Sequence, residues 1–120
     1  MIIDSHSHAW EFWPYEPPVP DHESRGQAEM MLWEMDRNGV DQAVLVCARI
    51  EHNPGNNDYV HDVVRRHPDR FIQFADVDCA WSDTYHTPGA AARLREAVER
   101  YHLKGFTHYV KSDTEWFSSD

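Results

Sequence analysis

The sequence predicts an α/β protein whose strands lie parallel in one sheet. Four short apolar runs alternate with three stretches of helical periodicity, and each helical stretch ends at a recognisable stop signal. The strands begin about 30 to 40 residues apart, which is typical of parallel strands joined by crossover helices. With 120 residues, 41% of them apolar and 12% aromatic, the chain is expected to form one packed domain.

The first unit is expected to have a strand over residues 1–8 and a helix over residues 26–38. Three prolines within residues 17–20 exclude helix and central strand between them, because proline has no amide hydrogen to donate. Gly39 suits the left-handed position that ends a helix. The helix has an apolar stripe of Ala28, Met31, Leu32 and Met35.

The second unit is expected to have its strand over residues 42–47. Its helix is predicted to begin near Asn57, a good N-cap residue, and to end at Pro68. The strand of the third unit follows over residues 71–77.

The third helix is predicted to open with Thr87 as its N-cap and Pro88 in its first position. A fourth strand is expected over residues 105–110, and the chain then ends without a fourth helix. The side chains of the third helix expected to face the core are Ala91, Leu94, Val98 and Tyr101.

Two architectures fit this pattern: a small open sheet, or half of a TIM-type (β/α)8 barrel. A complete barrel needs about 250 residues, so only half is present here. The end of the chain in mid-unit favours truncation of a longer protein, since a natural four-stranded half leaves two unprotected edges. We therefore predict a truncated, parallel (β/α)4 half-barrel, with residues 1–120 as a single incomplete domain.

The charge of the chain restricts its partners. It has 21 acidic and 11 basic side chains, a formal net charge of −10 with its nine histidines neutral. This excess repels nucleic acid and anionic membranes, so neither is expected as a partner. The sequence has no run of 18 apolar residues and does not begin like a signal peptide, which makes the cytoplasm the default location. Cys47 and Cys79 are expected to be reduced and buried.

The most informative residues lie in the first strand. Alternate side chains of a strand share a face, so Asp4, His6 and His8 are expected to point the same way. Two imidazoles at the carboxyl end of a barrel strand are suited to bind one divalent ion such as Zn²⁺. Asp4 lies deeper and is interpreted as a group that orients the ligands. The alternative is that both histidines are only hydrogen-bonded residues at a strand end.

This segment resembles a known family. Residues 3–8, Ile-Asp-Ser-His-Ser-His, look like the first-strand signature of the amidohydrolase superfamily, and residues 67–71, His-Pro-Asp-Arg-Phe, are similar to its amidohydrolase-2 branch. That branch includes aminocarboxymuconate-semialdehyde decarboxylase and several lactonases. The resemblance implies a metal-dependent (β/α)8 barrel that hydrolyses or decarboxylates small carbonyl compounds. His6 and His8 match the first-strand metal ligands.

The resemblance also implies groups that this chain lacks. Family members take further ligands from histidines on the fifth and sixth strands, and an aspartate of the eighth strand acts as ligand and general base. The isolated chain is therefore expected to be inactive, and the missing carboxyl-terminal half or a second copy is its expected partner. Zn²⁺ is the expected metal, Mn²⁺ is an alternative, and a metal-free site is a third because some lactonase relatives work without one.

Other residues are candidates for contact with a small-molecule substrate. Trp10 and Trp13 are expected to wall a pocket or to cover the barrel rim. His108 and Tyr109 lie on opposite faces of their strand, so only one faces the mouth, and a purely structural role for His108 is equally open. Lys111 lies near the place where some superfamily members carry a carboxylated lysine, although the amidohydrolase-2 branch does not generally use it.

Three functions remain open from the sequence. The first is the amino-terminal part of a hydrolase that acts on a lactone or another small carbonyl or carboxylate compound through metal-activated water. The second is a phosphoesterase barrel that uses the same pair of histidines. The third is a non-catalytic half-barrel that associates with itself, so that a twofold pair brings four histidines to one mouth.

Overall fold

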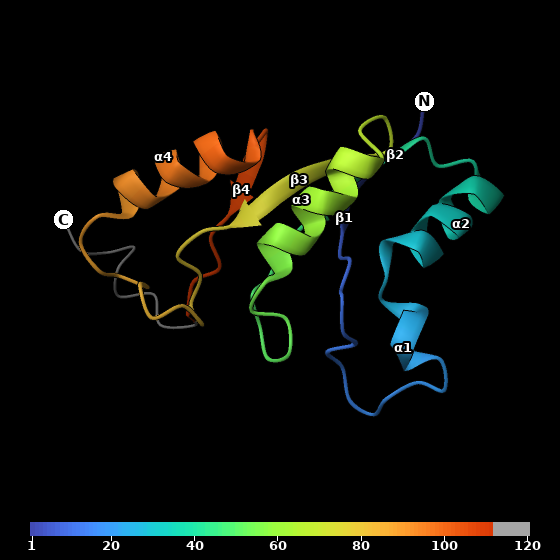
Figure 1. Cartoon of the computed structure of the whole chain (residues 1–120), viewed down its shortest axis with the longest axis horizontal. Helices are drawn as coiled ribbons and strands as arrows, with labels where there is room; N and C mark the ends of the chain where they lie inside the picture. Colours follow the sequence, from blue (N-terminus) through green and yellow to red (C-terminus); the bar gives the residue numbers. More distant parts are fainter. Residues whose placement is uncertain (112–120) are drawn as a thin grey trace.

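The computed structural model describes residues 1–111, so the last part of the expected domain lies outside the described residues. Strands and helices alternate along the described chain (Figure 1). In order, the elements are β1 (Ile3–Ser7), α1 (His22–Arg25), α2 (Ala28–Asn38), β2 (Gln42–Val46), α3 (Asn56–Arg66), β3 (Phe71–Asp76), α4 (Ala90–Tyr101) and β4 (Gly105–Thr107).

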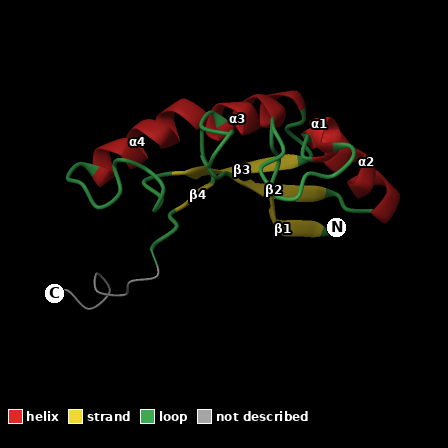
Figure 2. Cartoon of the chain, turned by 90° about the horizontal axis from the view of Figure 1, so that it is seen from below, coloured by secondary structure: helices red, strands yellow, loops and turns green. Residues whose placement is uncertain are grey.

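The strands form one parallel sheet in the order β1-β2-β3-β4. Figure 2 shows the helices on one side of this sheet, while the opposite side is left open. Sequential parallel strands with their crossover helices on one face are half of a closed (β/α)8 barrel. The predicted fold class, a parallel (β/α)4 half-barrel, is confirmed.

The core lies between the sheet and helices α2 and α3. Ala43 and Leu45 of β2 belong to this core, together with Cys47 just after the strand. This spacing is the two-residue period of a strand. They pack with Val60 and Val63 of α3, which are fully buried. The structure also bears out the prediction for the cysteines, since Cys47 and Cys79 are both free and buried.

The ends of the helices follow local chemistry. Gly39 has a φ of 68° at the end of α2, the left-handed conformation predicted for it. The prediction that Asn57 is an N-cap is wrong, because α3 begins at Asn56 with Gly55 as its cap. The side-chain amide of Asn57 instead donates a hydrogen bond to the backbone carbonyl of Asp76. The short helix α1 was not predicted from the sequence.

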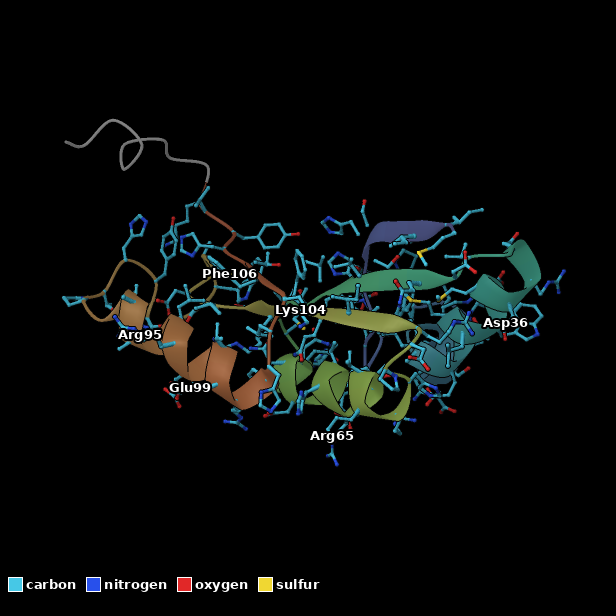
Figure 3. The ribbon with its side chains drawn as sticks, turned by 90° about the horizontal axis from the view of Figure 1, so that it is seen from above. Asp36, Arg65, Arg95, Glu99, Lys104 and Phe106 are labelled. Atoms are coloured by element: carbon cyan, nitrogen blue, oxygen red, sulfur yellow. The ribbon has the colours of Figure 1, made fainter. Side chains whose placement is uncertain are left out.

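Helix α4 differs most from the prediction. It begins at Ala90, because Gly89 before it has a φ of 99° and the Thr87 hydroxyl donates to the Thr84 carbonyl instead of capping the helix. No residue of α4 is buried, so the expected core role of its apolar stripe is wrong for the described residues. Val98 is 44% exposed, and Phe106 of β4, labelled in Figure 3, is 47% exposed.

The helices of the described part of the chain are also short. Within residues 1–111, none combines the length and the apolar character needed to cross a lipid bilayer.

Candidate functional site

Strand β1 has an irregular register that changes the direction of its polar side chains. Asp4 pairs with Ala43 and Ser7 pairs with Leu45, so three steps along β1 match two steps along β2. Because Ala43 and Leu45 face the helices, Asp4 and Ser7 face them too, and both line a hollow beside Met35 of α2. The expectation that Asp4 shares a face with the two histidines is wrong, since the extra residue breaks the alternation.

Asp4 contacts the backbone of the histidine segment. Its Oδ1 accepts a hydrogen bond from the His6 backbone amide at 3.0 Å, and its Oδ2 accepts one from the Ser7 hydroxyl. The bond from Ser7, with that from the His6 amide, lowers the pKa of the Asp4 carboxyl. The orienting role of Asp4 stays a prediction. Its carboxylate would act on His6 through the backbone amide of that residue.

His6 and His8 lie side by side at the carboxyl end of β1. Their ring centroids are 5.1 Å apart and their planes are inclined by 77°. Imidazoles that bind one Zn²⁺ in tetrahedral geometry, with nitrogens about 2.0–2.1 Å from the ion, have ring centres roughly 5 Å apart. The spacing of this pair therefore fits a shared divalent ion.

The ring of His8 is held in one orientation. Its Nδ1 lies 2.7 Å from the carbonyl oxygen of Val46, the last residue of β2. A carbonyl only accepts hydrogen bonds, so Nδ1 of His8 carries the proton and the lone pair of Nε2 is left for another partner. Metal-binding histidines in proteins commonly have this arrangement, in which a backbone carbonyl fixes the tautomer.

The aromatic residues after β1 support the histidine pair. The Trp10 ring stacks on His8 with centroids 5.4 Å apart, and Trp10 is only 3% exposed. Trp13 packs edge to face against Tyr15 at 5.1 Å, and its indole Nε1 is buried without a hydrogen-bond partner among the described residues. Trp10 is thus a buried support for His8, and contact of either tryptophan with a substrate stays a prediction.

Three asparagines hold the loops around the strand ends, a role that the sequence did not predict for any of them. Asn53 bonds both backbone groups of Phe12, with its Nδ2 2.8 Å from the Phe12 carbonyl oxygen. Asn56 and Asn57 bond the backbone at the ends of β1, β2 and β3, and all three amides are buried. The available signal was the cluster itself, since three asparagines lie within five residues of the loop and helix start that follow the buried strand β2, and asparagine side chains readily bond backbone groups.

A second group of polar side chains lies at the end of β3. The Oδ2 of Asp76 accepts hydrogen bonds from the Arg49 backbone amide at 2.7 Å and from the Trp81 indole at 2.6 Å. Its Oδ1 is buried and has no hydrogen-bond partner among the described residues, although Arg49 Nε lies 3.8 Å away. A hollow of about 530 Å³ that these residues line extends towards α4 and contains neither His6 nor His8.

The two candidates beyond β4, His108 and Lys111, are gathered around Tyr85. The rings of Tyr85 and His108 stack with centroids 6.0 Å apart, and His108 Nδ1 lies 3.1 Å from the Val77 carbonyl oxygen. The Lys111 ammonium lies 5.4 Å from the Tyr85 ring centroid, and the Lys111 backbone amide donates to the Tyr85 hydroxyl. Tyr109 packs on Trp81 instead. Because β4 ends at Thr107, His108 and Tyr109 both lie beyond the strand on which they were expected.

The structure therefore brings the predicted residues together in two groups. His6, His8 and Trp10 form one group at the end of β1, and His108 and Lys111 form another beyond β4. Within residues 1–111, no three side chains of His, Cys, Asp or Glu are close enough to hold a metal ion. The described residues thus bring two histidines together, whereas a catalytic zinc site usually has three ligands from the protein.

Comparisons with known proteins agree with the fold. The solved structure of 4-oxalomesaconate hydratase, LigJ, from Rhodopseudomonas palustris is similar in fold, with a TM-score of 0.56 at 20% sequence identity. The match covers 98% of this chain and 47% of that one, so the chain spans about half the length of that relative. No curated protein matches. A family model described as Amidohydrolase matches residues 3–120, and the chain belongs to this amidohydrolase family.

Proposed function

We propose that this chain is the amino-terminal part of a metal-dependent enzyme of the amidohydrolase family, in which His6 and His8 bind one divalent ion. The observation that carries the proposal is the paired arrangement of the two imidazoles, 5.1 Å apart at the end of β1. The match of the family model over residues 3–120 supports it. Zn²⁺ is the metal best suited to imidazole ligands here, and Mn²⁺ is the alternative.

The residues of the chain itself prepare the ligands. The Val46 carbonyl keeps the proton of His8 on Nδ1, and the stacked ring of Trp10 shields one face of His8 from water. A divalent ion bound there supplies Lewis acidity, which polarises a carbonyl oxygen and lowers the pKa of water. Binding without this preparation would also cost the entropy of ordering the His8 ring.

The proposed substrate is a lactone or another small carbonyl or carboxylate compound. Lys111 provides a cation, and Trp13 provides a buried indole donor that has no hydrogen-bond partner within residues 1–111. Both groups are suited to bind carboxylate oxygens. His108 is a further candidate contact. The similar solved protein is by its name a hydratase, an enzyme that adds water to its substrate, so hydration and hydrolysis are both reactions that fit activated water.

Further polypeptide is needed to complete the proposed site. The described residues supply two metal ligands, and neither a third ligand nor a general base is grouped with them. We propose that further strands of a complete barrel provide these groups. A second copy of this chain, which would bring its own two histidines to the mouth, is the alternative.

Metal binding by the full chain tests the first part of the proposal. Isothermal titration with Zn²⁺ is expected to show one binding event that His6→Ala and His8→Ala each weaken strongly. His22→Ala is the matched control, because His22 is an exposed histidine of α1 outside the site. Equal affinities of the wild type, His8→Ala and His22→Ala would contradict the proposal.

A substrate panel tests the second part. The 120-residue chain is expected to be inactive, and a longer protein that contains it is expected to hydrolyse lactones or hydrate small unsaturated carboxylates. Phosphoester turnover without turnover of either class would replace the proposal with the phosphoesterase alternative. Light scattering with and without Zn²⁺ tests the self-association alternative, for which a metal-dependent dimer is expected.

A further inference from the structure

We propose that Asn56 is a positioning residue for the His8 imidazole. This inference rests on the proposed metal site, because it assigns a buried amide outside that site to the alignment of one of its ligands. The Asn56 side chain bonds the backbone of Ala9 and Ala48, and acts on His8 through these two segments.

The contacts of Asn56 join the ends of two strands. Its Nδ2 donates to the Ala9 carbonyl at 2.8 Å, and its Oδ1 accepts from the Ala48 amide at 3.0 Å. Ala9 follows His8 directly, and Ala48 lies two residues after Val46, whose carbonyl binds the His8 ring. One side chain therefore connects the residue that carries the imidazole to the segment that orients it.

The position of these bonds explains why an amide is needed. Strands β1 and β2 end at Ser7 and Val46, so their ladder of backbone hydrogen bonds stops just before His8. An amide offers both a donor and an acceptor, and thus replaces the missing pair of cross-strand bonds. Asn56 is only 2% exposed, so water does not compete for these contacts.

A second asparagine restrains the same loop further along. Asn53 bonds both the amide and the carbonyl of Phe12. Trp10 lies between the two restrained backbone sites and stacks on the His8 ring. The loop that follows His8 and carries its stacking partner Trp10 is therefore fixed at both ends by residues of one segment, 53–56.

Asn57 provides a matched control within the same helical turn. It is 7% exposed, and it too bonds one backbone carbonyl and one backbone amide, both of Asp76, at 2.9 and 2.8 Å. These bonds lie at the end of β3, and none involves a neighbour of His6 or His8. Removing the Asn57 amide thus leaves the same number of buried backbone groups unpaired, without touching the proposed ligands.

The experiment compares Asn56→Ala and Asn57→Ala in the full chain. Both variants are expected to lose similar thermal stability. Asn56→Ala is expected to weaken Zn²⁺ binding by about 10–100-fold, the range found when partners that orient metal ligands are removed, while Asn57→Ala stays within about twofold of wild type. Equal weakening in both variants, or none in Asn56→Ala, would overturn the inference.

A metal-free readout separates this inference from the proposed function. Nitrogen-15 NMR of neutral histidine side chains is expected to show His8 in the Nδ1-protonated tautomer in wild type and Asn57→Ala, and a mixture of tautomers in Asn56→Ala. Absence of Zn²⁺ binding in wild type would refute the proposed function, whereas an unchanged His8 tautomer in Asn56→Ala would refute the positioning role. If Asn56→Ala does not fold, Asn56→Ser replaces it, because the serine hydroxyl can still bond one of the two backbone partners. Asn56→Ser is expected to show a smaller loss of Zn²⁺ affinity and a smaller change in the His8 tautomer.

Discussion

Arg93 of α4 is expected to be one of the most important polar residues for stability. Its Nε lies 2.8 and 2.9 Å from the two carboxylate oxygens of Asp78, just after β3. Its terminal nitrogens donate to the backbone carbonyls of Thr84, Thr87 and Pro88. A single guanidinium thus holds the loop from Asp78 to α4, which also carries the Tyr85 that contacts His108 and Lys111.

The magnitude for Arg93→Ala follows from burial. The Asp78 side chain is 7% exposed and the Arg93 side chain is 27% exposed. Removing one partner of a fully buried pair costs about 3–5 kcal/mol, because the other charge is left without compensation. Since a quarter of Arg93 is exposed, we expect Arg93→Ala to lower the free energy of unfolding by about 2–3 kcal/mol.

Arg95→Ala is the matched control, because Arg95 lies on the same helix (Figure 3) and its side chain forms no hydrogen bond or ion pair within residues 1–111. Arg95→Ala is expected to change the free energy of unfolding by no more than about 0.5 kcal/mol. Urea denaturation followed by tryptophan fluorescence measures both variants. Equal stability of the Arg93→Ala and Arg95→Ala variants at neutral pH would refute the reasoning.

The pH dependence gives a second check. Burial raises the pKa of Asp78, but hydrogen bonds from Arg93 and Thr84 outweigh it, and the pKa of the folded protein is lowered overall. A lowered pKa contributes stability that is present above the unfolded value of about 3.9 and is lost as the pH falls through the folded value. The difference in free energy of unfolding between wild type and Arg93→Ala is therefore expected to be largest at pH 7 and to become smaller as the pH falls. A difference that stays constant down to pH 3 would contradict this.

Two further predictions concern packing and the thiols. A Cβ added at Gly105 would lie 2.5 Å from the Phe74 ring, so Gly105→Ala is expected to cost about 1–3 kcal/mol in urea denaturation, whereas Gly55→Ala, which has open space, should change stability by less than about 1 kcal/mol. Burial raises the pKa of Cys47 and Cys79 to about 12, so mass spectrometry should find both unmodified after iodoacetamide treatment of the folded protein at pH 8. Full labelling of the folded protein at the rate seen in urea would contradict their burial.

The sequence predicted the fold because its signals are local. Apolar runs, Gly39 and the helix-ending prolines act on neighbouring residues, and the structure has the strands where these signals place them. The face of Asp4 was not predictable, because an extra residue in β1 becomes visible only once β1 pairs with β2. The exposure of α4 was missed for a similar reason, since an amphipathic pattern shows which side is apolar and not whether an element covers it.

The candidate site was predictable only in part. Two histidines at alternate positions are a local pattern, and the structure places their rings in contact. The roles of Val46 and Asn56 depend on long-range contacts, at separations of 38 and 47 residues, which no periodicity reveals. Polar residues that bond the backbone from a distance have no sequence spacing of their own.

The central claim is that His6 and His8 bind one divalent ion together. X-ray absorption at the zinc edge of the metal-loaded full chain counts the imidazole ligands directly. We predict at least two imidazole nitrogens about 2.0–2.1 Å from zinc in the wild type and one fewer in His8→Ala. A zinc environment with no imidazole, or one that His8→Ala leaves unchanged, would contradict the claim.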